Sequence, residues 1–306
     1  MSIRRPAVAG LAALLGLVSL VSAPGVLAGD PVIVGAGDIA NCGTTTDTAT
    51  GRILDTVGGT VFTLGDNAYS SGTASEFKNC YGPTWGRFKS RTRPATGNHD
   101  YATAGAKGYF DYFGSRAGSR ANGYYAYALG TWHIIVLNSN CGDVSCSADS
   151  PQVKWLKYVL AKTRGRNVLA MWHHPRFSSG RHGNDTSVQA FWDALYAEGA
   201  DIVLNGHDHN YERFAPQTPT GQLDQTYGIR QFVVGTGGTS LRSKGTTKAN
   251  SQVFSSTHGV LKLYLQARSF SWRFVPIAGK TFTDRGGQLT HGPRPASATI
   301  VDLEGS

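Results

Sequence analysis

Short polar blocks at the ends of apolar runs are the feature that most constrains how this chain folds. Five such blocks lie between residues 37 and 209: Gly37-Asp38, Gly65-Asp66-Asn67-Ala68-Tyr69, Gly97-Asn98-His99-Asp100, Trp172-His173-His174-Pro175 and Gly206-His207-Asp208-His209. Each closes a short run that is typical of a buried strand. Because open α/β sheets place their binding sites at the carboxyl ends of strands, we expect the five blocks to form one site.

The block around Asp66 carries the main hypothesis. The apolar run of residues 59–64 precedes it, and the phenol of Tyr69 follows three residues after the carboxylate. On its own, Gly-Asp-Asn is ordinary turn chemistry with no further role. Together with the other four blocks, it leads us to predict that the Asp66 carboxylate bridges two metal ions and that Tyr69 ligates one of them.

The side chains of the five blocks are carboxylates, a carboxamide, imidazoles and a phenol. This mixture suits iron, manganese or zinc, and it is too rich in nitrogen for calcium. In a strand, His207 and His209 would project to the same face, whereas in a turn they need not. Any one block alone is compatible with a turn or a capped histidine, but the five together predict a shared metal centre.

The blocks resemble those of the calcineurin-like metallophosphoesterase superfamily and, within it, the purple acid phosphatase branch. The resemblance spans Asp38 to His209, and the β-rich C-terminal part is also similar to the family. Tyr69 distinguishes the branch, because the protein phosphatase branch carries Asp-Arg after the second block whereas this chain has the Gly-Asp-x-x-Tyr form. The implied activity is hydrolysis of small phosphate monoesters by direct attack of metal-bound hydroxide.

The resemblance also implies a ligand set by position. The first metal ion, ferric iron in the family, would be held by Asp38, Asp66, Tyr69 and His209. The second, which is iron(II), zinc or manganese, would be held by Asp66, Asn98, His173 and His207. The predicted catalytic residues are His99 and His182, which with Asn98 would bind the substrate phosphate. His174 is expected to pack or cap without a chemical role.

Two other functions compete with this one. The same metal centre would serve a phosphodiesterase or a nucleotidase, since the surrounding pocket decides between them. A non-catalytic exported protein with structural metals is the alternative from another class. The chain carries a formal net charge of +9, which suits acidic substrates or an anionic cell surface. Its basic residues are scattered, so the sequence predicts no specific nucleic-acid or membrane partner.

Residues 1–28 are typical of a secretory signal peptide. Arg4 and Arg5 precede an apolar stretch over residues 7–21, and Val26-Leu27-Ala28 supplies a small-residue exit. The paired arginines also fit the twin-arginine route loosely. We therefore expect an exported, extracellular or periplasmic protein whose residues 29–306 form one metallophosphoesterase catalytic domain. Because the first block begins soon after the signal, no separate N-terminal β domain is expected.

Four cysteines, at positions 42, 80, 141 and 146, suit an oxidising compartment and allow three disulfide pairings. We favour Cys141–Cys146, which closes a tight polar loop and leaves Cys42–Cys80 to join two early loops. A zinc site is the competing interpretation, but the chain has no CxxC pair to support it.

The remaining pattern predicts an α/β fold: a β-sandwich of two mixed sheets flanked by helices. Helices are expected over residues 48–57, 150–165 and 187–198, and in part of 75–88. Residues 124–129 and 132–138 are expected to form a hairpin, and residues 231–234, 260–266 and 269–276 to be strands. The Gly- and Tyr-rich residues 101–123 have too little apolar periodicity to be predicted as core.

Overall fold

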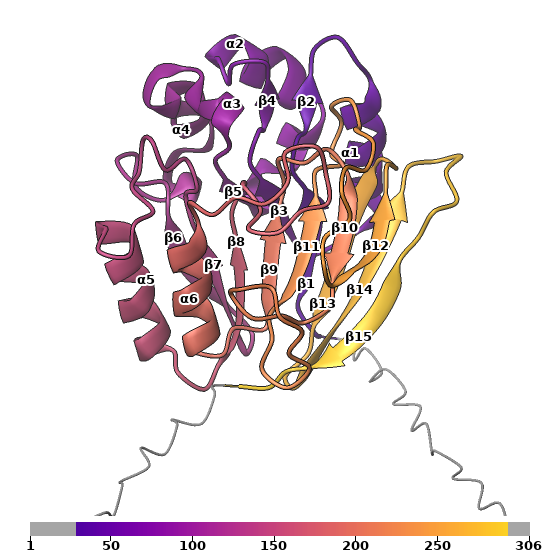
Figure 1. The fold of residues 1–306 in the computed structure, drawn as a ribbon. Coiled ribbons are helices and arrows are strands. Elements are labelled where there is room, and N and C mark those ends of the chain that lie inside the picture. The colour runs from indigo at the N-terminus through magenta and orange to yellow at the C-terminus, as the bar shows by residue number, and fades with distance from the viewer. Residues whose placement is uncertain (1–28, 293–306) are drawn as a thin grey trace, which may run out of the picture.

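Two β-sheets packed face to face form the centre of the protein in a computed structural model that describes residues 29–292 (Figure 1). The expected signal peptide, residues 1–28, lies outside the described residues, as do residues 293–306. Both sheets are mixed, and helices lie on the outside of the sandwich (Figure 1). The predicted fold class is confirmed.

The first sheet contains six strands in the order β15-β14-β13-β1-β3-β5. Its strands are β1 Val32–Ala36, β3 Thr60–Leu64, β5 Thr92–Ala95, β13 Gly259–Leu265, β14 Ser269–Pro276 and β15 Arg285–Leu289. β1, β3 and β5 run parallel, whereas β13 joins β1 antiparallel and continues into β14 and β15. The carboxyl ends of β1, β3 and β5 therefore lie at one edge of this sheet.

The second sheet contains seven strands in the order β12-β10-β11-β9-β8-β7-β6. Its strands are β6 Tyr125–Leu129, β7 Trp132–Val136, β8 Asn167–Met171, β9 Ile202–Asn205, β10 Tyr211–Phe214, β11 Arg230–Val234 and β12 Ser251–Ser255. β7, β8, β9 and β11 are parallel, and β6 forms the predicted hairpin with β7. A short parallel pair, β2 Ala40–Asn41 with β4 Ala68–Tyr69, lies above the first sheet (Figure 1).

The central strands β8 and β9 of the second sheet are buried on both faces, and alternate side chains enter different cores. In β9, Ile202 and Leu204 join the core between the sheets, whereas Val203 packs in the cluster under the helices. β8 repeats the pattern, because Leu169 faces inward and Val168 outward. This explains why these strands appear in the sequence as continuous apolar runs.

Two helices cover the outer face of the second sheet: α5 Pro151–Lys162 and α6 Gln189–Ala197 (Figure 1). Ser150 starts α5 as predicted, because its hydroxyl accepts a hydrogen bond from the Val153 amide at 3.2 Å, and Pro151 occupies the first turn. The apolar residues on one face of each helix, among them Leu156 and Trp192, are buried, which anchors the helices to the sheet.

The other helical segments lie mainly around the edge of the sandwich from which the polar blocks extend (Figure 1). They are α1 Thr46–Thr56, α2 Ala74–Glu76, η1 Phe77–Tyr81, η2 Trp85–Arg91, α3 Asn98–Tyr101, η3 Ala104–Ala106, α4 Lys107–Phe113 and η4 Gly114–Ala117. The helix predicted over residues 48–57 thus begins two residues earlier, and the segment predicted to be partly helical is confirmed.

The expectation that residues 101–123 are not core is wrong. Tyr109, Phe110 and Phe113 are buried in and around α4, and they pack edge to face with one another and with Phe77 and Tyr81. Large rings fill a small core from a short helix. A seven-residue helix has too few turns for its apolar periodicity to be evident in the sequence.

Both predicted disulfides are present, Cys42–Cys80 and Cys141–Cys146. The first joins the loop after β2 to η1, and the second closes the loop that precedes α5. Between residues 29 and 292, no helix combines the length and the hydropathy that crossing a bilayer requires.

Candidate metal centre

The five polar blocks leave the sheets at the same edge of the sandwich. Asp38 follows β1, Asp66 follows β3 and Asn98 begins α3 after β5, while the two histidine blocks follow β8 and β9. The first sheet meets the second through short contacts: the Leu64 carbonyl lies 2.7 Å from His173 Nδ1, and the amide of His207 donates to Asp38 Oδ2 at 2.9 Å. Side chains from both sheets therefore share one site.

Tight turns deliver these side chains. Asp38, Asp66 and His207 have positive φ angles of 60°, 49° and 70°, a region that costs an L-residue with a Cβ about 1–3 kcal/mol. Gly97 lets the third block approach Asp66, because a Cβ at this glycine would lie 2.2 Å from Asp66 Oδ1. Where the blocks converge, the backbone therefore either adopts a strained conformation or has a glycine in place of a residue with a side chain.

One group of donor atoms gathers around Tyr69. Its phenol oxygen lies 2.9 Å from Asp38 Oδ1, 2.9 Å from Asp66 Oδ2 and 3.4 Å from His209 Nε2. The imidazole of His209 is also 3.4 Å from Asp38 Oδ1. These four residues are the set predicted for the first metal ion.

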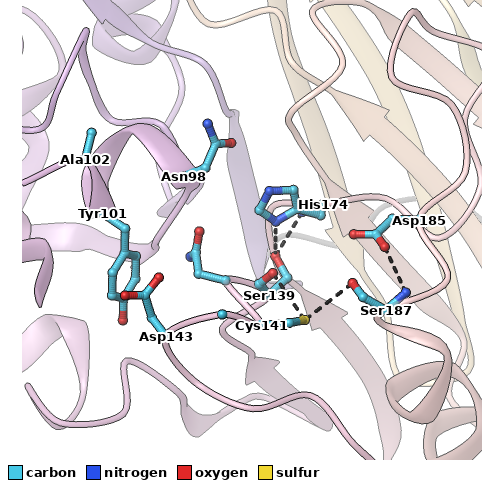
Figure 2. Close-up of a pocket in the computed structure, with 11 residues that line it drawn as sticks. Asn98, Tyr101, Ala102, Ser139, Cys141, Asp143, His174, Asp185 and Ser187 are labelled. Atoms are coloured by element: carbon cyan, nitrogen blue, oxygen red, sulfur yellow. Dashed lines mark hydrogen bonds between the residues drawn. The ribbon is translucent and has the colours of Figure 1, made fainter.

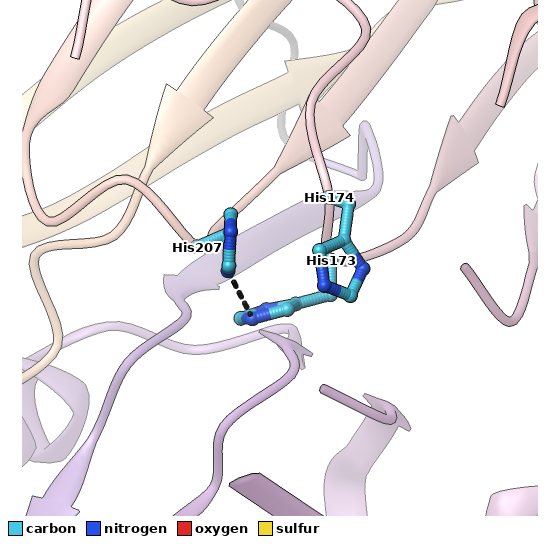
Figure 3. A group of neighbouring side chains, drawn as sticks. All are labelled: His173, His174 and His207. Atoms are coloured by element: carbon cyan, nitrogen blue, oxygen red, sulfur yellow. Dashed lines mark hydrogen bonds between the residues drawn. The ribbon is translucent and has the colours of Figure 1, made fainter. Parts of the chain in front are cut away.

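A second group gathers around His173, whose Nε2 atom lies 3.3 Å from Asp66 Oδ2 and 3.1 Å from Asn98 Oδ1. The same atom is 3.2 Å from Nδ1 of His207, the contact that Figure 3 marks between the two rings. Asp66 Oδ2 therefore belongs to both groups. The structure brings together all seven residues that the sequence predicted as ligands.

The donor set fits a pair of cations. Ligands at right angles around one ion, with bonds of about 2.1 Å, lie about 3 Å apart. The donor atoms here are separated by 2.9–3.4 Å. Asp38 and Asp66 are 0% and 1% exposed, and within residues 29–292 they have ion pairs only with histidines. Buried carboxylates without a lysine or arginine partner need positive charge from another source.

The phenol strengthens this inference. The single proton of Tyr69 can be donated to only one of its two carboxylate neighbours at a time. Burial, and then the charges of Asp38 and Asp66, raise the pKa of Tyr69 well above its usual value. The phenol therefore stays protonated among these side chains alone, and a phenolate here requires a cation beside it.

The histidines are oriented by bonds on their other ring nitrogen. His173 Nδ1 faces the Leu64 carbonyl at 2.7 Å and His209 Nδ1 faces the Ser240 carbonyl at 2.8 Å. Each carbonyl accepts from an Nδ1–H group, so Nε2 is the ring atom that faces the cluster and would bind a cation once it has lost its own proton. Burial lowers the pKa of His173, but Asp66 outweighs it and raises the value to about 9.

His207 and His209 lie in a turn, so they do not share the common face that a strand would provide. His207 points to the second group and His209 to the first. Two residues of one short block therefore contribute to both halves of the site. This arrangement depends on the positive φ at His207, where the sequence shows no glycine.

The two predicted catalytic histidines lie on different sides of the cluster. His99 Nδ1 is 2.5 Å from the Ser70 carbonyl, its ring lies 4.5 Å from that of Tyr69, and its Nε2 is 3.9 Å from Asp66 Oδ2. His182 packs its ring 4.2 Å from that of His207 and contacts the guanidinium of Arg242. Both therefore stand next to predicted ligands rather than among them.

His174 packs, as expected, but closer to the site than the sequence indicated. Its Nδ1 contacts the Ser139 hydroxyl at 2.8 Å, and its ring lies 4.4 Å from that of His207. Figure 3 shows it beside His173 and His207, and one ligand atom from each of the three lies within 4.8 Å of the others. Burial, and then the charge of His173, lower the pKa of His174 to about 4.

Sequence reasoning missed the residues that hold the blocks in place. Asp100, fully buried, accepts hydrogen bonds from the Gly97 amide at 2.9 Å and from the Asn67 carboxamide at 2.9 Å. Asp208 accepts from the amide of His182 at 2.9 Å. Both aspartates stand inside the quoted blocks, but nothing in the sequence separates a supporting carboxylate from a ligand.

A pocket of about 450 Å³ opens beside the second donor group (Figure 2). Asn98 and His174 line it, with Ser139 and the carboxylates of Asp143 and Asp185. Its lining includes no lysine or arginine, so this side of the site is acidic.

The chain belongs to the calcineurin-like phosphoesterase family, whose model matches residues 26–211. The matched region contains all five blocks. The predicted superfamily is therefore confirmed, and the β-rich part that follows residue 211 lies outside the match.

The relatives place the chain near the purple acid phosphatase branch, as predicted. It is 28% identical to purple acid phosphatase 15 of Arabidopsis thaliana over 256 residues, which are 71% of this chain and 46% of the relative. It is 32% identical to purple acid phosphatase 1 of Ipomoea batatas over 51% of this chain and 37% of that protein. The chain thus spans less than half the length of these relatives.

A solved structure shares the fold. Purple acid phosphatase PPD1 from yellow lupin, Lupinus luteus, superposes with a TM-score of 0.66 at 16% identity, over 87% of this chain and 55% of that one. This likeness supports the two-sheet architecture independently of the sequence blocks.

The close approach at Gly97 yields a prediction. Gly97→Ala should lower the free energy of unfolding by about 1–3 kcal/mol, because the added methyl group must displace Asp66 or its turn. Gly58→Ala is the matched control: no atom lies within 4 Å of its added Cβ, so stability should stay within about 1 kcal/mol or rise. Urea unfolding measures both. Equal stability of the two variants would show that the blocks are not tightly packed.

Proposed function

We propose that this chain is a dinuclear-metal phosphatase that hydrolyses small phosphate monoesters, with residues 29–306 as its catalytic domain. One observation carries the proposal: donor atoms from five strand ends lie 2.9–3.4 Å apart around a buried aspartate that belongs to both groups. Family membership and similarity to purple acid phosphatases support the same function.

The ligand assignment follows the two groups. Asp38, Asp66, Tyr69 and His209 would hold iron(III), and Asp66, Asn98, His173 and His207 would hold iron(II), zinc or manganese. A phenolate favours a hard trivalent ion, and the neutral carboxamide of Asn98 limits negative charge at the second position. Such a pair of ions supplies an activated water and neutralises phosphoryl oxygens.

The protein's own side chains would bind and orient the ester. Asn98 borders the acidic pocket, and His99 and His182 flank the donor cluster with half-exposed or exposed rings. His99 has Nδ1 occupied by the Ser70 carbonyl, which leaves Nε2 to donate a proton to the leaving oxygen when the ring is charged. His182 would donate to a phosphoryl oxygen. Two such donors suit the dianion of a monoester better than the monoanion of a diester.

Asp66 provides the direct test of the proposal. Asp66→Asn should lower kcat for p-nitrophenyl phosphate by at least about a thousandfold, because the carboxylate common to both ions is lost. Asp149→Asn, at an exposed position, is the control and should retain full activity. Bis-p-nitrophenyl phosphate, assayed in parallel, tests the phosphodiesterase alternative. Metal-loaded protein that hydrolyses neither ester would favour a non-catalytic metal-binding protein.

Tyr69 provides a spectroscopic test. If its phenolate ligates iron(III), the metal-loaded protein should be coloured by a visible charge-transfer band, and Tyr69→Phe should abolish that band. Iron content and far-UV circular dichroism control for loss of metal or fold. Colour that persists in Tyr69→Phe with iron still bound would exclude the tyrosine as the ligand.

We also propose that residues 1–28 direct export. Two disulfides in the described residues fit an oxidising compartment. Protein collected from the medium or periplasm of expressing cells should begin at Gly29 when its N-terminus is sequenced. An intact N-terminus on protein that stays in the cytoplasm would contradict export.

A further inference from the structure

A second cavity, of about 500 Å³, opens beside His182. It is lined by Arg181, His182, Lys244 and Lys248, with glycines and hydroxyl-bearing residues between them. Its lining contains no aspartate or glutamate. The two cavities at the metal centre therefore differ in the sign of their charge.

The basic cavity adjoins the donor cluster directly. His182 lines it, and the ring of His182 lies 4.2 Å from the ring of His207. The loop that supplies the lysines is tied to the other histidine of that block: the Ser240 carbonyl contacts His209 Nδ1 at 2.8 Å, and the Arg242 amide donates to the His209 carbonyl at 2.9 Å. The lining of this cavity and the loop that supplies its lysines are therefore in contact with the two histidines of the fifth block.

The loop that carries Lys244 and Lys248 is also fixed to Ser179, which lies in the loop between β8 and α6. The Gly245 amide donates to the Ser179 carbonyl at 2.8 Å, and the Lys248 amide donates to the Ser179 hydroxyl at 2.9 Å. These two hydrogen bonds hold the backbone that carries Lys244 and Lys248 against the segment that carries Arg181. All three cationic residues therefore line the same cavity.

The protein balances the charges of this cavity only in part: Lys244 interacts electrostatically with the buried Glu212, and its ammonium lies 5.5 Å from the centre of the Phe254 ring. Among residues 29–292, Arg181, Lys244 and Lys248 form no ion pair. The buried carboxylates nearby already have partners: Asp208 accepts from the His182 amide, and Glu212 accepts from the Ser179 amide and the Ser251 hydroxyl. A cavity lined by three cationic residues and by no carboxylate favours an anionic ligand.

We propose that this cavity binds a second phosphate of the substrate, so that the preferred substrates are small phosphate compounds with two or more phosphate groups. The inference rests on the proposed phosphatase function and specifies its substrate class. The phosphate to be hydrolysed lies at the metal centre, and the neighbouring phosphate lies among Arg181, Lys244 and Lys248. The carboxylates of Asp143 and Asp185 repel an anion from the acidic pocket, which favours this orientation (Figure 2).

Adenosine diphosphate and adenosine monophosphate provide a matched pair of probes that differ by one phosphate. Lys244→Glu/Lys248→Glu should lower kcat/KM for the diphosphate by at least about tenfold, chiefly through KM, because a binding contact that leaves the chemistry unchanged is lost. The monophosphate, which does not extend into the cavity, should change by less than about threefold. The loss for the diphosphate should shrink at high salt.

Lys154→Glu/Lys157→Glu is the control, because it makes the same change in net charge on the exposed side of α5. It should leave both substrates within about twofold of wild type. Equal losses for the two substrates in the cavity variant, or no loss for the diphosphate, would overturn the inference.

Failure of the proposed function would be recognised separately. If metal-loaded wild type hydrolyses neither nucleotide nor p-nitrophenyl phosphate, the phosphatase proposal is wrong. Calorimetric titration of the same two nucleotides then tests whether the cavity binds the second phosphate. If Lys244→Glu/Lys248→Glu weakens binding of the diphosphate but not of the monophosphate, the inference is supported; if binding of the diphosphate is unchanged, it is refuted.

Discussion

The contact that organises this protein is the meeting of Asp66 with donors from both sheets. Its carboxylate is 1% exposed and touches Tyr69, His173 and the amide of His99. Burying a carboxylate is costly unless its charge is compensated, and the ion-pair partners of Asp66 within residues 29–292 are the imidazoles of His99 and His173. Turns with positive φ and a glycine at position 97 are needed to bring those groups close. A cation site, as proposed above, would account for both the strained backbone and the charge cluster.

The same centre has two unlike surroundings. On one side, Asn98 and His174 border a pocket with the carboxylates of Asp143 and Asp185. On the other, His182 borders a cavity lined by lysine and arginine. A charge difference across a reaction centre orients an anionic substrate before any chemistry takes place. Loops after β8 and β11 supply much of this difference, so substrate selection can vary while the predicted metal ligands on the strand ends stay fixed.

Much of the fold was predictable because strong local signals agree with the tertiary structure. Ser150-Pro151 marks the start of α5, and alternate burial of Val203 and Leu204 makes β9 a continuous apolar run. The prediction that residues 101–123 lie outside the core is wrong for a physical reason. The aromatic core there is built by rings that meet across several short segments, so no local period records it.

By itself, the sequence determined which donor types are present, that they follow strand-like runs, and to which family they are similar. Only the tertiary structure decided which donors meet, because the contacts join residues far apart in the chain: the amide of His207 reaches Asp38 across 169 positions. It also decided that His207 and His209 serve different groups, since that depends on one turn. The charges of the two cavities belong to loops packed against each other, and packing between distant loops leaves no local pattern in the sequence.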